Sequence, residues 1–204
     1  MADFHQNGVI STLHNLSNRS LDEIEKELRE YSKDAPIELI LPSLYSELDG
    51  EALKNIVSCL SDVKYLNHIT IGLDNADKSE FIKAKKFFAS LNQSHSIIWN
   101  DSPKMKKLDS DLKKIGIAPN QSGKGKNVWY CMGYTYSRNE ANSVALHDCD
   151  ITTYNRDLLA RLVYPVSNPN FNYEFCKGYY PRIREGALSG RVTRLLVTPL
   201  LKTI

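Results

Sequence analysis

Short apolar segments alternate with longer amphipathic segments along most of the chain. The short segments predict buried strands at 37–41, 68–73, 96–99 and 143–146. Between and around them, apolar residues recur at helical spacing and predict helices at 21–31, 50–60, 81–91, 104–115 and 155–164. Because strands that alternate with helices pair in parallel, the pattern predicts an α/β fold with a parallel sheet and right-handed crossovers.

The two ends of this pattern carry further predictions. Ser20, with Glu23 three residues later, forms a capping box that predicts a helix start. Residues 1–33 are therefore interpreted as an N-terminal helical arm and residues 34–204 as one α/β domain. Near the other end, residues 173–180 alternate like a strand that ends at Pro181.

Polar side chains follow each of the four predicted strands. They are gathered at 43–47, 74–77, 100–101 and 148–150. The carboxyl ends of parallel strands meet at one edge of a sheet, which is where α/β proteins bind their ligands. These residues therefore predict a nucleotide crevice.

The D-x-D pair of Asp148 and Asp150 is the strongest candidate for chemistry. Two carboxylates just beyond a buried strand are hard oxygen ligands that suit Mg²⁺ or Mn²⁺, with the phosphates of a bound diphosphate completing the shell. The alternative is a turn, because Asp after a strand often bonds its own backbone. By strand alternation Cys149 points away from the two carboxylates and is interpreted as a packing residue.

A glycine-lysine loop at 120–127 opens a helix that ends near Tyr136. Glycines allow the backbone to approach a ligand, and helix N-termini attract phosphate. The P-loop pattern is absent, since Gly123-Lys124-Gly125-Lys126 lacks both its spacing and its hydroxyl residue. Lys124 is a candidate counter-charge for a phosphate or a sugar, and a flexible surface turn is the alternative.

Glycine, arginine and threonine at 190–193 form a second candidate anion site at the start of an apolar helix. Backbone N–H groups, a guanidinium and a hydroxyl can converge there on a phosphate or a carboxylate. The alternative is a helix cap with a surface arginine. A basic cluster that suits an anionic acceptor beside a metal-held donor is formed by Arg182, Arg184, Arg191 and Arg194.

Composition narrows the classes of function. A formal net charge of +2 over 204 residues argues against bulk electrostatic binding of nucleic acid. No apolar run approaches the roughly 20 residues needed to span a bilayer. The N-terminus has no signal-peptide pattern and the four cysteines form no C-x-x-C, so we expect reduced thiols and a cytoplasmic protein. The usual motifs of serine hydrolases, zinc peptidases and dinucleotide dehydrogenases are absent.

In this order, the motifs resemble those of the glucosyl-3-phosphoglycerate synthases and the related mannosylglycerate-type synthases. The residues that carry the resemblance are Pro42-Ser43-Leu44 after the first strand, Gly123-Lys124-Gly125 before a Trp-bearing helix, the strand that runs into Asp148 and Asp150, and Gly190-Arg191-Val192-Thr193 before a Leu-rich helix. The resemblance covers roughly residues 37–201. It implies the GT-A fold of retaining glycosyltransferases, with a mixed, mostly parallel, Rossmann-like sheet flanked by helices.

The resemblance also implies roles for individual residues. The implied donor site, at the base, ribose and phosphates, consists of Pro42, Ser43, Leu44, Glu47, Asp74, Lys124 and Asp148. Mg²⁺ or Mn²⁺ would be held by Asp148 and Asp150. The phosphoglycerate acceptor would be bound by Gly190, Arg191, Val192 and Thr193. The implied catalytic residues are Lys124, Asp150 and Arg191.

The sequence departs from the family at three places. Tyr45 and Ser46 stand where the family has Asn-Glu, with Glu47 only after them, which leaves the choice between UDP and GDP open. His147, directly before the D-x-D, adds a ligand or a hydrogen-bond donor. The family's chain continues beyond the Leu-rich helix, so we expect this chain to lack the family's C-terminal part.

The implied function is metal-dependent transfer of a hexose to a small acidic acceptor such as 3-phosphoglycerate, with retention of the anomeric configuration and with UDP-glucose as the favoured donor. The product, glucosylglycerate in phosphorylated form, suits a role in making compatible solutes. The alternatives are a GDP-mannose-dependent mannosyltransferase and a truncated, non-catalytic module that binds nucleotide sugars. The expected partners are a nucleotide sugar and a small anionic acceptor, without nucleic acid or membrane, and a homodimer stays open.

Overall fold

The computed structural model describes residues 18–178, 182–184, 187–189, 196 and 199–200. The chain divides into two compact units, one formed by Ser20–Cys176 and the other by the two terminal segments. In the second unit, β5 (Arg182–Arg184) and β6 (Ala187–Ser189) pair antiparallel. Within these described ranges, no helix has the length and apolar character needed to cross a membrane.

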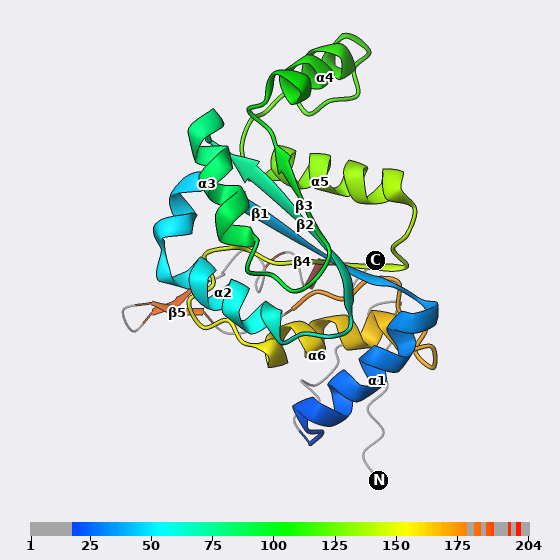
Figure 1. Ribbon diagram of the computed structural model, residues 1–204. Coiled ribbons are helices and arrows are strands. Elements are labelled where there is room, and N and C mark those ends of the chain that lie inside the picture. Colours follow the sequence, from blue (N-terminus) through cyan, green and yellow to red (C-terminus); the bar gives the residue numbers. More distant parts are fainter. Residues whose placement is uncertain (1–17, 179–181, 185–186, 190–195, 197–198, 201–204) are drawn as a thin grey trace. The chain divides into compact units, whose positions relative to one another are not determined.

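The larger unit is built around a four-stranded sheet (Figure 1). Its strands, in the order β3-β2-β1-β4, are β1 (Ile37–Leu44), β2 (Leu66–Asp74), β3 (His95–Trp99) and β4 (Ser143–Leu146). Each neighbouring pair is parallel, so the predicted α/β, Rossmann-like class is confirmed. The chain runs outward from β1 to β3 and then returns to the other side of β1 as β4. The strand order therefore reverses at the junction of β1 and β4.

Helices connect the strands and begin at recognisable caps. They are α1 (Leu21–Asp34), α2 (Glu51–Ser61), α3 (Lys78–Phe88), α4 (Pro103–Lys114), α5 (Lys124–Arg138) and α6 (Arg156–Ser167), with a short 3₁₀ helix η1 (Tyr45–Asp49) after β1. The predicted capping box is confirmed, because Ser20 Oγ accepts from the N–H of Glu23 and the Glu23 carboxylate accepts from the N–H of Ser20. Such reciprocal bonds satisfy backbone donors that a helix start leaves unpaired.

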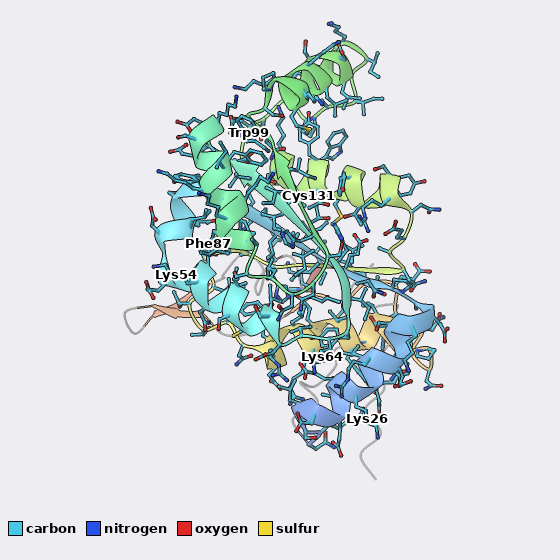
Figure 2. The ribbon with its side chains drawn as sticks, in the orientation of Figure 1. Lys26, Lys54, Lys64, Phe87, Trp99 and Cys131 are labelled. Carbon is cyan, nitrogen blue, oxygen red and sulfur yellow. The ribbon has the colours of Figure 1, made fainter. Side chains whose placement is uncertain are left out.

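One face of the sheet is covered by α5. Gly72 in β2 makes this packing possible, since a Cβ there would lie 1.7 Å from Oδ1 of Asn127 and 2.5 Å from Sγ of Cys131. Asn127 in turn donates from Nδ2 to the carbonyl of Gly72 across 3.0 Å. Cys131, labelled in Figure 2, is completely buried in a cluster with Ile40 and Ile98. The position of α5 is therefore fixed by a close backbone approach to β2.

The other face of the sheet carries α2 and α3 (Figure 1). Trp99, at the end of β3, stacks on Phe81 of α3 with ring centroids 4.8 Å apart and planes at 11°. Its indole N–H donates to the carbonyl of Ala76 across 2.8 Å. Leu39 and Leu41 of β1 are completely buried, as expected for a strand that is covered on both faces.

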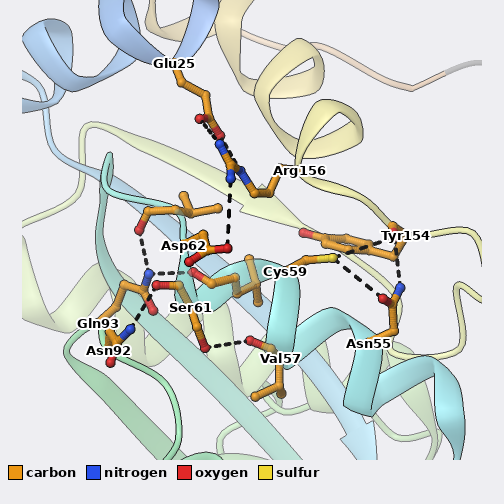
Figure 3. Close-up of polar contacts among 12 residues, drawn as sticks. Glu25, Asn55, Val57, Cys59, Ser61, Asp62, Asn92, Gln93, Tyr154 and Arg156 are labelled. Atoms are coloured by element: carbon orange, nitrogen blue, oxygen red, sulfur yellow. Dashed lines mark hydrogen bonds and ion pairs between the residues drawn. The ribbon is translucent and has the colours of Figure 1, made fainter. Parts of the chain in front are cut away.

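Three helices meet at Arg156, the first residue of α6 (Figure 3). Its guanidinium donates to both carboxylate oxygens of the buried Glu25 in α1, at 3.1 Å from Nε and 2.5 Å from Nη2. It also lies 4.0 Å from the carboxylate of Asp62 at the end of α2. The two-pronged geometry ties α1 to α6.

Several local predictions differ from the structure. β1, predicted to end at 41, continues to Leu44, and α3, predicted at 81–91, spans Lys78–Phe88. Residues 173–178 form no strand, because alternation alone does not provide a neighbouring strand with which to pair. Helix α6 extends to Ser167, beyond the predicted end at 164, and includes Pro165. Pro165 gives up one backbone donor, but its ring is buried near the end of the helix, where that loss matters least.

Candidate functional site

The D-x-D lies immediately beyond the carboxyl end of β4. The N–H of His147 donates to the carbonyl of Ile40 across 3.1 Å and so extends the pairing with β1 by one residue. From there the side chains alternate, since His147 and Cys149 are buried, Asp148 is partly exposed and Asp150 is exposed. The two carboxylates therefore face solvent while the thiol between them packs inward, as the alternation predicts.

Lys124 brings the glycine-lysine loop to the D-x-D. Gly123 has a φ of 115°, a left-handed conformation that favours glycine, and α5 begins at the next residue. Nζ of Lys124 lies 2.6 Å from Oδ1 of Asp148, and the two side chains remain 52% and 43% exposed. Two motifs that are separate in the sequence thus form one accessible, charged cluster at a helix N-terminus, where an anionic group is favoured.

The carboxyl end of β1 lies beside this cluster. β1 pairs with β4 as far as Ile40 and continues to Leu44. The carboxylate of Glu47 accepts a 2.9 Å hydrogen bond from the N–H of Leu44, which fixes the turn into η1. Burial raises the pKa of the Cys149 thiol, and the negative charge of the Glu47 carboxylate raises it further. The turn after β1 therefore acts electrostatically on the D-x-D segment. The predicted donor residues that end β1 or follow it are Pro42, Ser43, Leu44 and Glu47.

Asp74, the other predicted donor residue at a strand end, closes β2 opposite Leu44. Its carboxylate accepts a 2.7 Å hydrogen bond from Nδ2 of Asn100. Burial raises the pKa of Asp74, while the hydrogen bond from Asn100 acts in the opposite direction. The neighbouring Asp101 accepts from the N–H of Ala76 across 3.1 Å. The ends of β2 and β3 therefore form a hydrogen-bonded group of their own.

Sequence reasoning missed Tyr154 in the loop that follows the D-x-D. Its hydroxyl lies 3.2 Å from Nδ1 of His147, and the two rings meet edge to face. Burial lowers the pKa of His147 to about 4, with Asp148 opposing the shift, so the imidazole is neutral at pH 7. The one signal in the sequence is an aromatic residue between the polar residues Thr153 and Asn155, which matches no motif.

The predicted acceptor site lies outside the described residues. It consists of Gly190, Arg191, Val192 and Thr193. Arg194 is also outside them, whereas Arg182 and Arg184 belong to β5 in the other unit. The acceptor and catalytic roles of Arg191 stay predictions.

The donor atoms at the D-x-D fit a divalent cation that is shared with a substrate. Asp148 and Asp150 offer carboxylate oxygens on the solvent side of the loop. In the part of the chain that the structure describes, no group of three or more His, Cys, Asp or Glu side chains is placed to hold a metal ion. Mg²⁺ usually takes one or two carboxylates and completes its shell with water and substrate phosphates, so this pair matches that chemistry.

Comparison with known proteins shows similarity along the whole chain. No family profile matches it. It is 47% identical over all 204 residues to a glucosyl-3-phosphoglycerate synthase of Persephonella marina, and 36% identical over 99% of its length to a glucosyl-3-phosphoglycerate synthase of Methanococcoides burtonii. In both cases it spans 50% of the relative. The resemblance carried by the motifs is thereby confirmed: along its full length the chain is similar to two glucosyl-3-phosphoglycerate synthases, and it spans about half the length of each.

Proposed function

We propose that this chain is the donor-binding half of a glucosyl-3-phosphoglycerate synthase, a glycosyltransferase that moves glucose from a nucleotide sugar to 3-phosphoglycerate. The observation that carries the proposal is the 2.6 Å pair of Lys124 and Asp148, at the junction of β1 and β4. Open α/β sheets bind their ligands where the strand order reverses. A diphosphate that is bound through a lysine and a metal ion needs a positively charged side chain for its phosphates and carboxylates for the metal ion at that point.

The nucleotide would lie across the end of β1. Leu44 offers an apolar side chain that is 40% exposed, and Asp74 ends the neighbouring strand opposite it. A base placed there would meet an apolar surface and a carboxylate that can accept from a ring N–H. The names of the relatives favour glucose over mannose as the transferred hexose, and UDP as its carrier is part of this proposal.

The phosphates would lie between the D-x-D and the start of α5. Asp148 and Asp150 would hold Mg²⁺ or Mn²⁺, with Asp150 the stronger candidate for direct coordination because Asp148 is paired with Lys124. The bound cation would neutralise charge that develops on the departing diphosphate. Lys124 would leave Asp148 and contact a phosphate oxygen, exchanging one anionic partner for another.

The acceptor would be a small acid such as 3-phosphoglycerate. Its phosphate or carboxylate would be held by Arg191 and Thr193 while its hydroxyl attacks the anomeric carbon. Attack on the face from which the diphosphate leaves would retain the anomeric configuration, with the departing phosphate oxygen taking up the proton of the hydroxyl. This step rests on the resemblance to the family.

Isothermal titration calorimetry with UDP-glucose and with GDP-mannose, each with and without Mn²⁺, tests the proposal. We expect UDP-glucose to bind and to require Mn²⁺. Asp111→Ala is a matched control for the D-x-D, because Asp111 lies in α4, is also exposed, and is paired with a lysine across 2.9 Å. Its loss should leave the binding unchanged.

The other outcomes separate the alternatives. No metal-dependent binding of either nucleotide sugar would contradict the proposal. Binding of GDP-mannose alone would reassign the donor. Binding of UDP-glucose without transfer to 3-phosphoglycerate would describe a donor-binding module.

A further inference from the structure

The D-x-D sits in a short loop whose two ends are joined by their side chains. Nδ1 of His147 lies 3.2 Å from the hydroxyl of Tyr154, and the rings meet edge to face with centroids 5.3 Å apart and planes at 73°. Each of these residues is only 3% exposed. Asp148 and Asp150 lie between them in sequence. The contact therefore closes the loop from the inside, while the carboxylates face outward.

Each end of this loop is also fixed to the rest of the unit. On one side, the N–H of His147 donates to the carbonyl of Ile40 in β1. On the other, the carbonyl of Tyr154 accepts a 2.9 Å hydrogen bond from Nδ2 of Asn55 in α2 and lies 3.9 Å from the Cys59 thiol (Figure 3). The contact between His147 and Tyr154 thus connects an anchor on the sheet with an anchor on a helix.

Stability alone does not explain this contact. Nε2 of His147 is buried and makes no hydrogen bond to any described residue, and an unpaired polar atom in an interior destabilises the fold. Apolar side chains of similar size would fill the same space without that penalty. Local features that work against stability are typical of functional sites, and this one adjoins the two carboxylates.

We propose that His147 and Tyr154 are positioning residues that staple the D-x-D loop, so that Asp148 and Asp150 are held at the separation that a divalent cation and a diphosphate require. This inference rests on the proposed function, because it assigns the residues behind the same site. His147 acts through its neighbours, since its ring lies on the buried side of the loop and Nδ1 is engaged by Tyr154. Loss of groups that orient metal ligands from behind lowers metal affinity by about 10- to 100-fold.

The test measures Mn²⁺ affinity in the presence of UDP, by electron paramagnetic resonance of free Mn²⁺, for the 204-residue chain and its variants. The double variant His147→Leu/Tyr154→Phe removes both polar partners together, so it leaves neither of them newly unpaired and can retain near-normal stability. We expect its Mn²⁺ affinity to fall by about 10- to 100-fold. Thermal unfolding of the same samples shows that the loss comes from the site and not from an unfolded chain.

Single variants test the same effect on Mn²⁺ affinity without relying on the double variant. Tyr154→Phe removes only the hydroxyl and keeps the ring packing, so it should lose affinity in the same direction. It leaves the buried Nδ1 of His147 unpaired, so a lower unfolding temperature is expected, while the protein should remain folded at the temperature of the titration. Thr135→Val is the matched control for loss of a buried polar contact, because its hydroxyl lies 3.4 Å from that of Thr70 between α5 and β2. Its Mn²⁺ affinity should equal that of the wild type.

His147→Asn separates the staple from direct ligation. Asparagine keeps a polar atom near the place of Nδ1 and has none at the place of Nε2. If the contact with Tyr154 is what matters, affinity should stay within about threefold of the wild type. A loss as large as in the double variant would contradict a positioning role for the contact between His147 and Tyr154, and would assign the role to Nε2 of His147.

The remaining outcomes distinguish this inference from the proposed function. A wild type that binds Mn²⁺ with UDP, together with a double variant that binds equally well, overturns the staple and leaves the proposed function in place. A wild type that shows no UDP-dependent binding of Mn²⁺ overturns the proposed function and the staple with it.

Discussion

The two halves of the sheet's carboxyl edge use their carboxylates differently. At β1 and β4, Asp148 is partly exposed and its ion pair with Lys124 is open to solvent. At β2 and β3, Asp74 is held by the amide of Asn100, and Asp101 by a backbone N–H. The same edge of the sheet therefore carries an accessible ion pair beside β1 and β4. At the ends of β2 and β3, it carries carboxylates that are hydrogen-bonded within the protein.

This difference teaches that carboxylates at the same edge of a sheet are not equally free to turn to a charged ligand. An accessible ion pair contributes about 0–1 kcal/mol to stability, so its charges can turn to a ligand with little loss. A partly buried carboxylate that is bonded within the protein stabilises its surroundings, and withdrawing it leaves its partners unpaired. Helix α5 serves both regions, because Lys124 reaches Asp148 while Asn127 reaches Gly72 near the end of β2.

The largest contrast between the two regions is expected from Asp150→Ala. Asp150 is exposed, so its loss should leave stability nearly unchanged. Removal of a direct metal ligand should weaken Mn²⁺-dependent binding of UDP-glucose by about 100-fold or more. Calorimetry measures the affinity, and urea unfolding checks the stability. An unchanged affinity would mean that the metal is held elsewhere.

Gly72→Ala should disturb both regions at once. The added Cβ would fall 1.7 Å from Oδ1 of the buried Asn127, so α5 would have to shift, and we expect a loss of about 1–3 kcal/mol in the free energy of unfolding. Urea denaturation provides the value. The donor affinity should fall as well, because Lys124 moves with the helix.

Gly133→Ala is the control for this variant. Gly133 lies in the middle of the same helix, is exposed, and has open space around the position of a Cβ. Alanine should stabilise α5 there by about 0.5–1 kcal/mol. If the two alanines had the same effect, the close approach at Gly72 would not be what seats α5 on the sheet.

Lys124→Met tests whether the open pair exchanges partners. Without the ammonium group, Asp148 is free for the cation, so Mn²⁺ affinity in the absence of nucleotide should rise by up to about fivefold. Affinity for UDP-glucose should fall, because a phosphate contact is lost. Lys104→Met, an exposed lysine of α4, is the control. Changes of the same sign in both affinities would contradict an exchange of partners.

Asp74→Asn should give the smallest effect, and it appears in the pH dependence. Because burial raises the pKa of Asp74 above the usual 3.8, the folded state holds this proton more tightly than the unfolded state. The stabilisation from this group is therefore complete at low pH and declines as pH rises through the raised pKa. Asparagine still accepts from Asn100 and does not titrate. Urea unfolding at several acidic pH values should show that the variant becomes more stable relative to the wild type as the pH rises. A difference in stability that does not change with pH would contradict the raised pKa of Asp74.

The strands were predictable because their side chains are dictated by burial on both faces. The segments around Ile40 and Ile71 are short and mostly apolar, which is typical of parallel strands between helices. The start of α1 was predictable from Ser20 and Glu23 for a local reason, since capping depends on residues three apart. Residues 173–178 show the limit of this reasoning, because alternation records a side-chain pattern but not a pairing partner.

The candidate site was only partly predictable for a related reason. Asp148 and Lys124 stand in recognisable motifs, whereas their contact depends on how α5 docks on β2 through Gly72. Tyr154 and Asn127 belong to no motif, and their roles arise from packing between elements. A single sequence gives no signal for such residues until the elements are placed.

The pairing of β4 with β1 has a consequence for how the protein folds. Strands β1, β2 and β3 follow one another through successive helices, but Ser143 pairs with Ile37 across about two thirds of the length of the larger unit. Closing so long a loop is entropically unfavourable until the other strands are in place. We therefore expect β4 to join the sheet last, so that the carboxylates beyond it acquire their geometry only in the completed unit. A nucleotide bound with its cation would stabilise that finished state alone and would report that folding is complete.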